Sequence, residues 1–436
     1  MHLSPTAIDY TVRHLFRVAF PHTTPTIAVG DGNVVVTVES TTVLFPLLTE
    51  AQTAALLAGK ASLIYVDNSY WNCVPLFTTR EEEIPYSIEN QQIKLHCDLL
   101  TPAFLLLSRW EEWQSDHPRD SHGRFLLEGS LQQKYDCISL PMVDGYAMLL
   151  RQWVCEAAPT LRVEPRTSHF ISTHDIDILT RFGGLRKSMR TLLADLLKYR
   201  SFSRFRASME HYKAYRQNFM NDPYIAACNQ LYATDHQRGH DSIFFVKGLT
   251  TGEEDCTYDI GGDEAVTAVR HLQELGATVG LHGSYQSALN ADALALEKER
   301  IEKVCGQPVT IGRQHYLRCD LPQTLRCWQS AGITDDYTLG FAEFEGFRCG
   351  TCHPYPLYDI ENDRPTSIIE HPLIVMDTTL VKYRQLSPYE ASEAIIGMRE
   401  ACEAAEGDFV LLWHNTSTTR EYWPWYLEAF CKIDKR

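Results

Sequence analysis

Apolar and polar positions along the chain change their pattern near residue 162. Beyond residue 170, short apolar runs of strand length alternate with longer segments of helical period. The runs Ser242–Val246, Thr278–Leu281 and Phe409–Leu412 predict strands. The segment Asp263–Leu275 has apolar residues at helical spacing and predicts a helix. Repeated alternation of strands and helices is typical of a parallel sheet covered by helices, either open or closed into a barrel.

The first 162 residues show a mixed pattern instead. Thr26–Val29 and Val34–Glu39 predict two strands, and Val143–Ala157 predicts a helix. The 436 residues of the chain exceed the usual size of one domain. We therefore expect a smaller mixed α/β N-terminal domain over residues 1–162 and an α/β domain over residues 163–436.

Composition excludes several classes of protein. Hydrophobic residues make up 44% and charged residues 22%, as in ordinary globular proteins. The net charge of −16 argues against a nucleic-acid partner, which needs basic excess against phosphate. The apolar runs are too short for a transmembrane segment, and the first residues do not have the pattern of a signal peptide. Thirteen cysteines without regular spacing indicate reduced thiols, so we expect a cytoplasmic protein.

One basic segment stands out in this acidic chain. Residues 181–216 contain ten Lys or Arg but only two acidic residues, Asp195 and Glu210. The segment is expected to be helical. It is compatible with a solvated helix face, or with contact to an anionic substrate carrier or a membrane surface.

Polar residues follow the predicted strands of the second domain. Because the carboxyl ends of the strands carry the active site in α/β barrels, we expect these residues to share one site. They are His174, Asp175, Asp177, His282, Arg313, His315, Tyr316, Asp335, Asp336, His414 and Asn415.

The types of these residues indicate metal chemistry. Asp175 and Asp177 are two positions apart, so an extended backbone points both carboxylates to one face, where a cation would relieve their repulsion. The alternative is a pair of acids that caps the next segment. His282 is either a structural histidine or a ligand for zinc or another first-row metal. Arg313 either fixes a catalytic carboxylate or forms an ordinary ion pair, and His414 has the residue type of a general acid.

In this order the motifs of residues 165–420 resemble the polysaccharide deacetylase family, also called the NodB homology domain. The resemblance implies a distorted (β/α) barrel. Thr173-His-Asp-Ile-Asp177 resembles the first motif, which implies that Asp175 is the catalytic base and Asp177 a metal ligand. His282-Gly-Ser-Tyr-Gln286 resembles the second motif and implies that His282 is a ligand, but Gln286 stands where a second histidine is expected. An amide is a poor ligand for these metals, so we expect His315, with His174 in reserve, to supply the missing nitrogen.

The remaining motifs complete the implied machinery. Arg313-Gln-His-Tyr316 resembles the third motif and implies that Arg313 orients the base and that the Tyr316 backbone N–H stabilises the oxyanion. Leu411-Leu-Trp-His414 resembles the last motif and implies that His414 is the general acid. Asp336 is our candidate for the fourth motif. The segment Leu105–Glu112 and the loop Gly346–Asp359 also resemble a divergent, largely uncharacterised branch of the family with a similar N-terminal domain.

The resemblance implies a metal-dependent hydrolase that removes an N-acyl group from an amino sugar or glycan, with acetyl as the preferred candidate for that group. The expected cofactor is a divalent metal, with zinc before other first-row metals, and the expected partner is a carbohydrate or lipid-linked sugar. Gln286 motivates an alternative, a metal-poor pseudoenzyme that serves as a carbohydrate-binding or regulatory module. A third hypothesis keeps the metal hydrolase but changes the substrate to another amide or a formamide. The sequence sets neither the oligomeric state nor the role of residues 1–162.

Overall fold

The fold was analysed in a computed structural model. It describes residues 2–30, 33–66, 74–79, 84–114, 117–250, 252–255 and 258–418. Among these residues, none of the helices combines the length and the apolar character needed to traverse a bilayer.

The N-terminal part mixes helices with two small sheets, as the sequence predicts. One sheet has the strand order β1-β2-β3-β7-β6 and the other β4-β5-β8. The elements in chain order are α1 (Pro5–Ala19), β1 (Thr26–Gly30), β2 (Asn33–Val38), β3 (Thr41–Pro46), α2 (Glu50–Leu57), β4 (Leu63–Val66), β5 (Val74–Thr78), β6 (Tyr86–Glu89), β7 (Gln92–Leu95), β8 (Cys97–Asp98), α3 (Leu100–Leu107), α4 (Trp110–Trp113), α5 (Leu131–Lys134) and α6 (Met142–Ala157).

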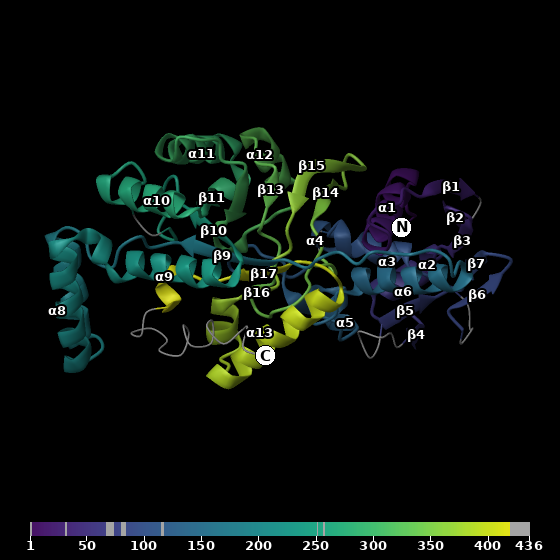
Figure 1. Cartoon of the computed structure of the whole chain (residues 1–436), viewed down its shortest axis with the longest axis horizontal. Coiled ribbons are helices and arrows are strands. Elements are labelled where there is room, and N and C mark those ends of the chain that lie inside the picture. The colour runs from purple at the N-terminus through teal and green to yellow at the C-terminus, as the bar shows by residue number, and fades with distance from the viewer. Residues whose placement is uncertain are drawn as a thin grey trace.

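The rest of the chain alternates strands with helices. The elements are β9 (Phe170–Ile176), α7 (Leu185–Leu197), α8 (Phe202–Gln217), α9 (Pro223–Arg238), β10 (Asp241–Val246), α10 (Asp263–Leu275), β11 (Thr278–Gly283), α11 (Ala291–Cys305), β12 (Ile311–Gln314), α12 (Gln323–Ala331), β13 (Asp335–Asp336), β14 (Tyr355–Asp359), β15 (Arg364–Glu370), β16 (Val375–Met376), α13 (Pro388–Ala404) and β17 (Phe409–Leu412). In Figure 1 the large sheet lies between the N-terminal elements at one end of the molecule and α8 and α10 at the other.

Nine strands form the large sheet, in the order β14-β15-β13-β12-β11-β10-β9-β17-β16. All neighbouring pairs are parallel except β14 with β15. The predicted α/β architecture with a parallel sheet is therefore confirmed. Within the described residues, no ladder joins β14 to β16, so strand pairing leaves the sheet open where a barrel was expected. Backbone hydrogen bonds from Leu373 N–H to the Leu339 carbonyl (3.1 Å) and from Gly346 N–H to the Ile374 carbonyl (2.9 Å) connect the segments that follow β13 and precede β16.

Helix α10 shows how the sequence builds the cover of this sheet. Its apolar residues Ala265, Val269 and Leu272 recur every three or four positions and are buried. Gly276 ends the helix with a φ of +103°, a backbone conformation that residues with a Cβ rarely adopt. The helix thus begins and ends at the residues predicted from the pattern.

The segment that follows β13 joins the two parts of the chain. Tyr355 and Tyr358 contact α1 through ring contacts with His14 and Tyr10. Gly350 accepts a backbone hydrogen bond from Val143 of α6 (2.8 Å). The buried apolar residues of both parts consequently form one continuous core.

The neighbouring thiols Cys349 and Cys352 are free and buried in this core. Cys352 contacts the Asp144 carboxylate of α6, and His353 Nε2 lies 2.8 Å from the Ala405 carbonyl. The contact of Cys352 with Asp144 therefore joins the two parts of the chain, whereas that of His353 lies within the second part.

Candidate active site

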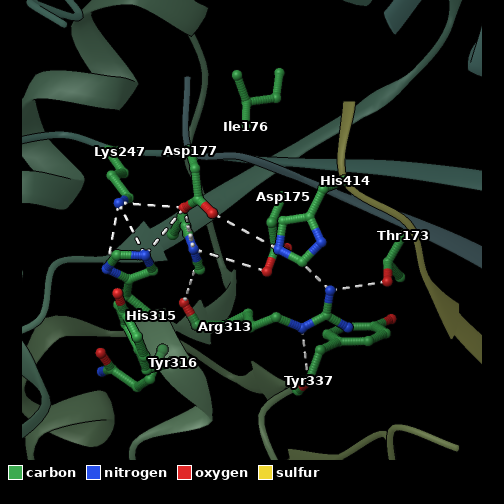
Figure 2. A network of polar contacts seen from close by, with 12 residues as sticks. Thr173, Asp175, Ile176, Asp177, Lys247, Arg313, His315, Tyr316, Tyr337 and His414 are labelled. Carbon is green, nitrogen blue, oxygen red and sulfur yellow. Dashed lines mark hydrogen bonds and ion pairs between the residues drawn. The ribbon is translucent and has the colours of Figure 1, made fainter. Parts of the chain in front are cut away.

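Parallel register places the carboxyl ends of β9, β10, β11 and β12 along one edge of the sheet. His282 of β11 pairs with Arg313 of β12, and β10 lies between β11 and β9. Figure 2 shows the resulting polar network, in which Asp177 lies between Lys247 and His315 on one side and His414 on the other.

Asp177, His282 and His315 form the centre of this network. Asp177 Oδ1 lies 3.3 Å from His282 Nε2 and 3.1 Å from His315 Nε2. One ligand atom from each of the three residues falls within 4.8 Å of the others. The structure thus brings together the three residues that the sequence suggested as metal ligands.

Polar contacts on the far side of each ring orient both histidines. His282 Nδ1 lies 3.1 Å from the Arg313 carbonyl, and His315 Nδ1 lies 2.7 Å from Asp255 Oδ1. In the neutral ring, a proton on Nδ1 toward these acceptors leaves the lone pair of Nε2 for a metal. Histidine ligands of metals are commonly oriented by a carbonyl or a carboxylate in this way.

The central atoms are also poorly satisfied by the protein. Asp177 Oδ1 and His282 Nε2 are buried, and neither makes a hydrogen bond of normal geometry within the described residues. Buried polar atoms are nearly always hydrogen-bonded, and a carboxylate with two imidazoles is a common donor set for zinc. The residues present therefore fit a divalent metal.

Charge at the centre is balanced by cations. Burial opposes ionisation of Asp177, but the imidazoles of His282 and His315 and the ammonium of Lys247 hold the pKa of its carboxyl well below the usual range. Burial lowers the pKa of His282, which favours the neutral ring that a metal requires. Burial also opposes the charge on His315, but Asp177 and Asp255 raise its pKa.

Asp175 is held by a fully buried arginine. Arg313 Nη1 donates to Asp175 Oδ1 (3.0 Å) and to Thr173 Oγ1 (2.8 Å), and Arg313 Nε donates to the Tyr337 carbonyl (2.9 Å). The guanidinium also lies over the Phe245 ring, 4.7 Å from its centroid. These contacts leave Asp175 Oδ2 directed toward His282 Nε2, at 3.7 Å.

His414 forms a second histidine–carboxylate pair at the end of β17. Its Nδ1 lies 2.7 Å from Asp377 Oδ1, and its backbone N–H donates to Asp377 Oδ2 (2.7 Å). Burial disfavours the charged ring, but the charge and hydrogen bond of Asp377 raise the pKa of His414 to about 9. Its Nε2 lies 3.6 Å from Asp177 Oδ2, so a protonated ring faces the centre.

Tyr316 follows β12 in a left-handed backbone conformation, with a φ of +62°. Arg124 of the N-terminal part donates to the Tyr316 carbonyl (3.1 Å) and to the Tyr383 hydroxyl (3.0 Å). A cleft of about 210 Å³ opens here over the polar centre. It is lined by Arg124, Asp175, Asp177, Glu254, His315, Tyr316, Leu317, Met376, Thr378, Lys382, Tyr383, Leu412 and His414.

Comparisons with known proteins cover the two parts of the chain separately. Residues 4–159 match the model of a family of unknown function (DUF7033). No curated protein matches the chain.

Solved structures are similar to the chain at low identity. A candidate polysaccharide deacetylase from Mycobacterium smegmatis is 18% identical, over 63% of this chain and 85% of that one, with a TM-score of 0.40. A pseudoenzyme of the CE4 family is 10% identical, over 64% and 68% of the two chains (TM-score 0.31). The chitin deacetylase of Colletotrichum lindemuthianum is 12% identical, over 62% and 85% (TM-score 0.30). At these scores, function has to be argued from this chain's own residues.

Three residues named from the sequence lie apart from the centre. His174, the reserve ligand, is turned to the other face of β9, where Nε2 lies 2.9 Å from Asp235 Oδ2. Gln286 is exposed, whereas His282 is buried. Asp336 is buried in β13, accepts hydrogen bonds from Thr338 and is not among the residues that line the cleft.

The sequence reasoning missed three residues of the centre, and two of them had a signal. Lys247 comes directly after β10 and Asp377 directly after β16, the same strand-end position that marked the other residues. Lys247 Nζ lies 3.2 Å from Asp177 Oδ1 and 3.3 Å from Asp255 Oδ1. Asp255 lies in an irregular loop, where sequence periodicity gives no signal.

Proposed function

We propose that this chain is a metal-dependent hydrolase that removes an N-acyl group from an amino sugar or glycan, with acetyl as the preferred candidate for that group. The observation that carries the proposal is the convergence of Asp177, His282 and His315, with Asp175 and His414 facing the same centre from either side. The motif order that resembles polysaccharide deacetylases supports the substrate class. A resemblance to their distorted barrel is part of the same proposal.

Asp177, His282 and His315 would hold the metal, which supplies Lewis acidity toward the amide carbonyl and toward water. Asp175, fixed by Arg313, takes a proton from the attacking water. The water oxygen forms a bond to the carbonyl carbon, and the C–N bond breaks. His414, protonated at neutral pH because of Asp377, delivers a proton to the departing nitrogen. The Tyr316 N–H is the proposed donor to the developing oxyanion.

The proposal is tested by metal binding and product release together. Purified protein should bind Zn²⁺, Co²⁺ or Mn²⁺ in calorimetry, and the loaded protein should release acetate from N-acetylglucosamine oligomers. His282→Ala should weaken metal affinity at least tenfold, about 1.4 kcal/mol. The exposed His2 serves as the matched control, because His2→Ala removes a histidine outside the cluster. Absence of metal binding by the folded wild-type protein would overturn the proposal.

A pseudoenzyme is the second candidate, and Lys247 favours it. Its ammonium already compensates Asp177 and Asp255 at the position where a metal would be expected. Under this alternative, the protein binds acylated sugar oligomers in the cleft without releasing acetate, whether or not metal is supplied. A screen of other acylated sugars, small amides and formamides for acetate or formate release separates this alternative from a hydrolase with a different substrate.

A further inference from the structure

Helix α7 exposes a row of large apolar side chains on the surface. We call this row the apolar stripe. It consists of Leu185, Met189, Leu193, Leu196, Leu197 and, at the start of α8, Phe202. Leu185 is 72% exposed, Leu197 74% and Phe202 73%. Scattered exposed apolar residues are normal on a protein surface, but a contiguous patch marks an interaction site.

Helical geometry explains why the stripe is continuous. At about 100° per residue, the five stripe residues of α7 occupy roughly one third of the helix circumference. A different face, with Ser188, Leu192 and Asp195, is buried. The stripe is therefore a surface additional to the one that holds α7 in the fold.

Buried contacts fix this arrangement. Asp195 of α7 accepts a hydrogen bond from Ser208 of α8 (2.5 Å) and lies 3.6 Å from Arg181 and 3.5 Å from Arg204. Because the Asp195 carboxylate is buried with these partners, rotating α7 to hide the stripe would break a buried network of charges. In Figure 1, α8 projects at the end of the molecule opposite the N-terminal elements.

Charge around the stripe is strongly positive. Residues 181–216 hold ten Lys or Arg and only two acidic residues, in a chain whose net charge is −16. Asp195 is buried, and Glu210 lies 3.6 Å from Arg206. On α7 the basic residues Arg186 and Arg190 follow the stripe around the helix, so that long cationic side chains border its apolar surface.

We propose that the helical pair α7–α8 docks on an anionic lipid surface, with the apolar stripe in the interface and the basic residues against lipid headgroups. An amphipathic helix with apolar and basic faces binds such surfaces in this way. A second copy of this chain fits less well, because pairing two such segments would bring twenty basic side chains together, twice the ten of one segment. The inference does not depend on the proposed hydrolase activity.

Vesicle co-sedimentation of the full chain tests the proposal. The protein should bind phosphatidylcholine vesicles that contain about one third phosphatidylglycerol, and binding to pure phosphatidylcholine should be at least tenfold weaker. Binding should fall as salt screens the charges. The double variant Leu193→Ser/Leu197→Ser should lose at least tenfold in affinity, and Arg186→Glu/Arg190→Glu should lose a similar factor.

A matched control removes an exposed leucine elsewhere. Leu296 of α11 is 48% exposed, and Leu296→Ser should bind vesicles as the wild type does. Circular dichroism checks that each variant is folded. The proposal is overturned if anionic vesicles are not bound, if neutral vesicles are bound equally well, or if the stripe variant binds unchanged. A concentration-dependent dimer in light scattering that the stripe variant abolishes would assign the stripe to a second copy instead.

Discussion

Asp177 is the residue on which the candidate site depends, and the cation beside it decides how the site behaves. Lys247 Nζ lies 3.2 Å from Asp177 Oδ1 and from both ring nitrogens of His315. An ammonium at that distance stabilises the carboxylate, but it repels any second cation placed on the same ligands. Metal affinity is therefore set by a competition within the protein.

Lys247→Met should strengthen metal binding. Removing the ammonium leaves Asp177 and Asp255 uncompensated, so we expect Zn²⁺ affinity to rise at least tenfold, about 1.4 kcal/mol. Titration calorimetry of folded wild type and variant measures this, and Lys213→Met, at an exposed position on α8, is the control. Equal or weaker binding by Lys247→Met would show that the lysine supports metal binding instead of opposing it.

Sequence reasoning reached Asp177, His282 and His315, but not Lys247 or Asp377, because polar residues at strand ends are visible in a pattern. Asp177 and His282 end apolar strands, and His315 alternates with Arg313. The alternation of side chains along a strand also puts His174 on the opposite face of β9 from Asp175, and there it contacts Asp235. The roles of Asp177, His282 and His315 as ligands, and of Asp175 and His414 as catalysts, stay predictions.

At the scale of elements, Arg124 of the N-terminal part supports the turn after β12. Tyr316 and Leu317 both have positive φ, an unfavourable conformation for residues with a Cβ. Arg124 holds the Tyr316 carbonyl, and Asp120 in turn holds Arg124 (2.7 Å to Nε). The proposed oxyanion donor thus owes its position partly to residues far away in sequence.

Arg124→Met should loosen this turn. Losing the hydrogen bond to the Tyr316 carbonyl, worth about 1 kcal/mol, should speed amide exchange of residues 315–318 about fivefold. Hydrogen exchange with mass spectrometry measures the effect. Arg119→Met is the control, because Arg119 binds the Gly123 carbonyl in the same loop and not Tyr316. Equal protection of residues 315–318 in wild type and Arg124→Met would show that Arg124 does not stabilise this turn.

Two glycines should respond oppositely to a methyl group. Gly397 in α13 has open space where a Cβ would lie, so Gly397→Ala should raise the free energy of unfolding by about 0.5–1 kcal/mol. At Gly248, a Cβ would lie 2.2 Å from the Glu297 carbonyl oxygen. Gly248→Ala should therefore lower the free energy of unfolding by about 2 kcal/mol. Urea unfolding measures the free energy of unfolding of both variants. A change of the same sign in both would contradict the packing described for Gly248.

Elements with strong periodicity were predicted closely, and others were missed for a physical reason. The predicted strand Phe409–Leu412 and helix Asp263–Leu275 are confirmed as β17 and α10. Helix α9 and the hairpin of β14 with β15 were not predicted. In the hairpin, Arg364–Glu370 is partly exposed and mostly polar, so its residues give little apolar strand signal although its pairing with β14 across residues 360–363 is local.

At the scale of the whole molecule, a buried ion network ties the two parts together. Glu112 of α4 lies 2.6 Å from Arg348 Nη2 and 2.8 Å from Arg109 Nε, and all three side chains are buried. Burial opposes the charge on Glu112, but Arg348 and Arg109 lower its pKa to about 2. The boundary near residue 162 was drawn from sequence pattern alone, which gives no sign of this network.

Glu112→Gln should destabilise the protein at neutral pH by about 3–5 kcal/mol, because two buried guanidiniums lose their counter-charge. The lowered pKa means that the wild-type contribution is present above the unfolded carboxyl's pKa of 4.5 and is lost as pH falls toward about 2. Between pH 7 and pH 4 the gap between wild type and variant should narrow by roughly 1 kcal/mol. Urea unfolding at both values measures it, with the exposed Glu89→Gln as control. A gap that widens toward pH 4 would contradict this assignment.

The position of Arg124 in the cleft has a consequence for how this chain can evolve. Its partners Tyr316 and Tyr383 lie 192 and 259 residues away, yet one guanidinium contacts both. Because every residue has a backbone carbonyl, the contact at position 316 constrains no side chain, whereas Arg124 and Tyr383 meet through their side chains and should covary among descendants. A recombinant protein that carried residues 1–162 of a distant homologue would have the homologue's residues where Arg124 now lines the cleft. Selection should therefore transmit the two parts as one unit.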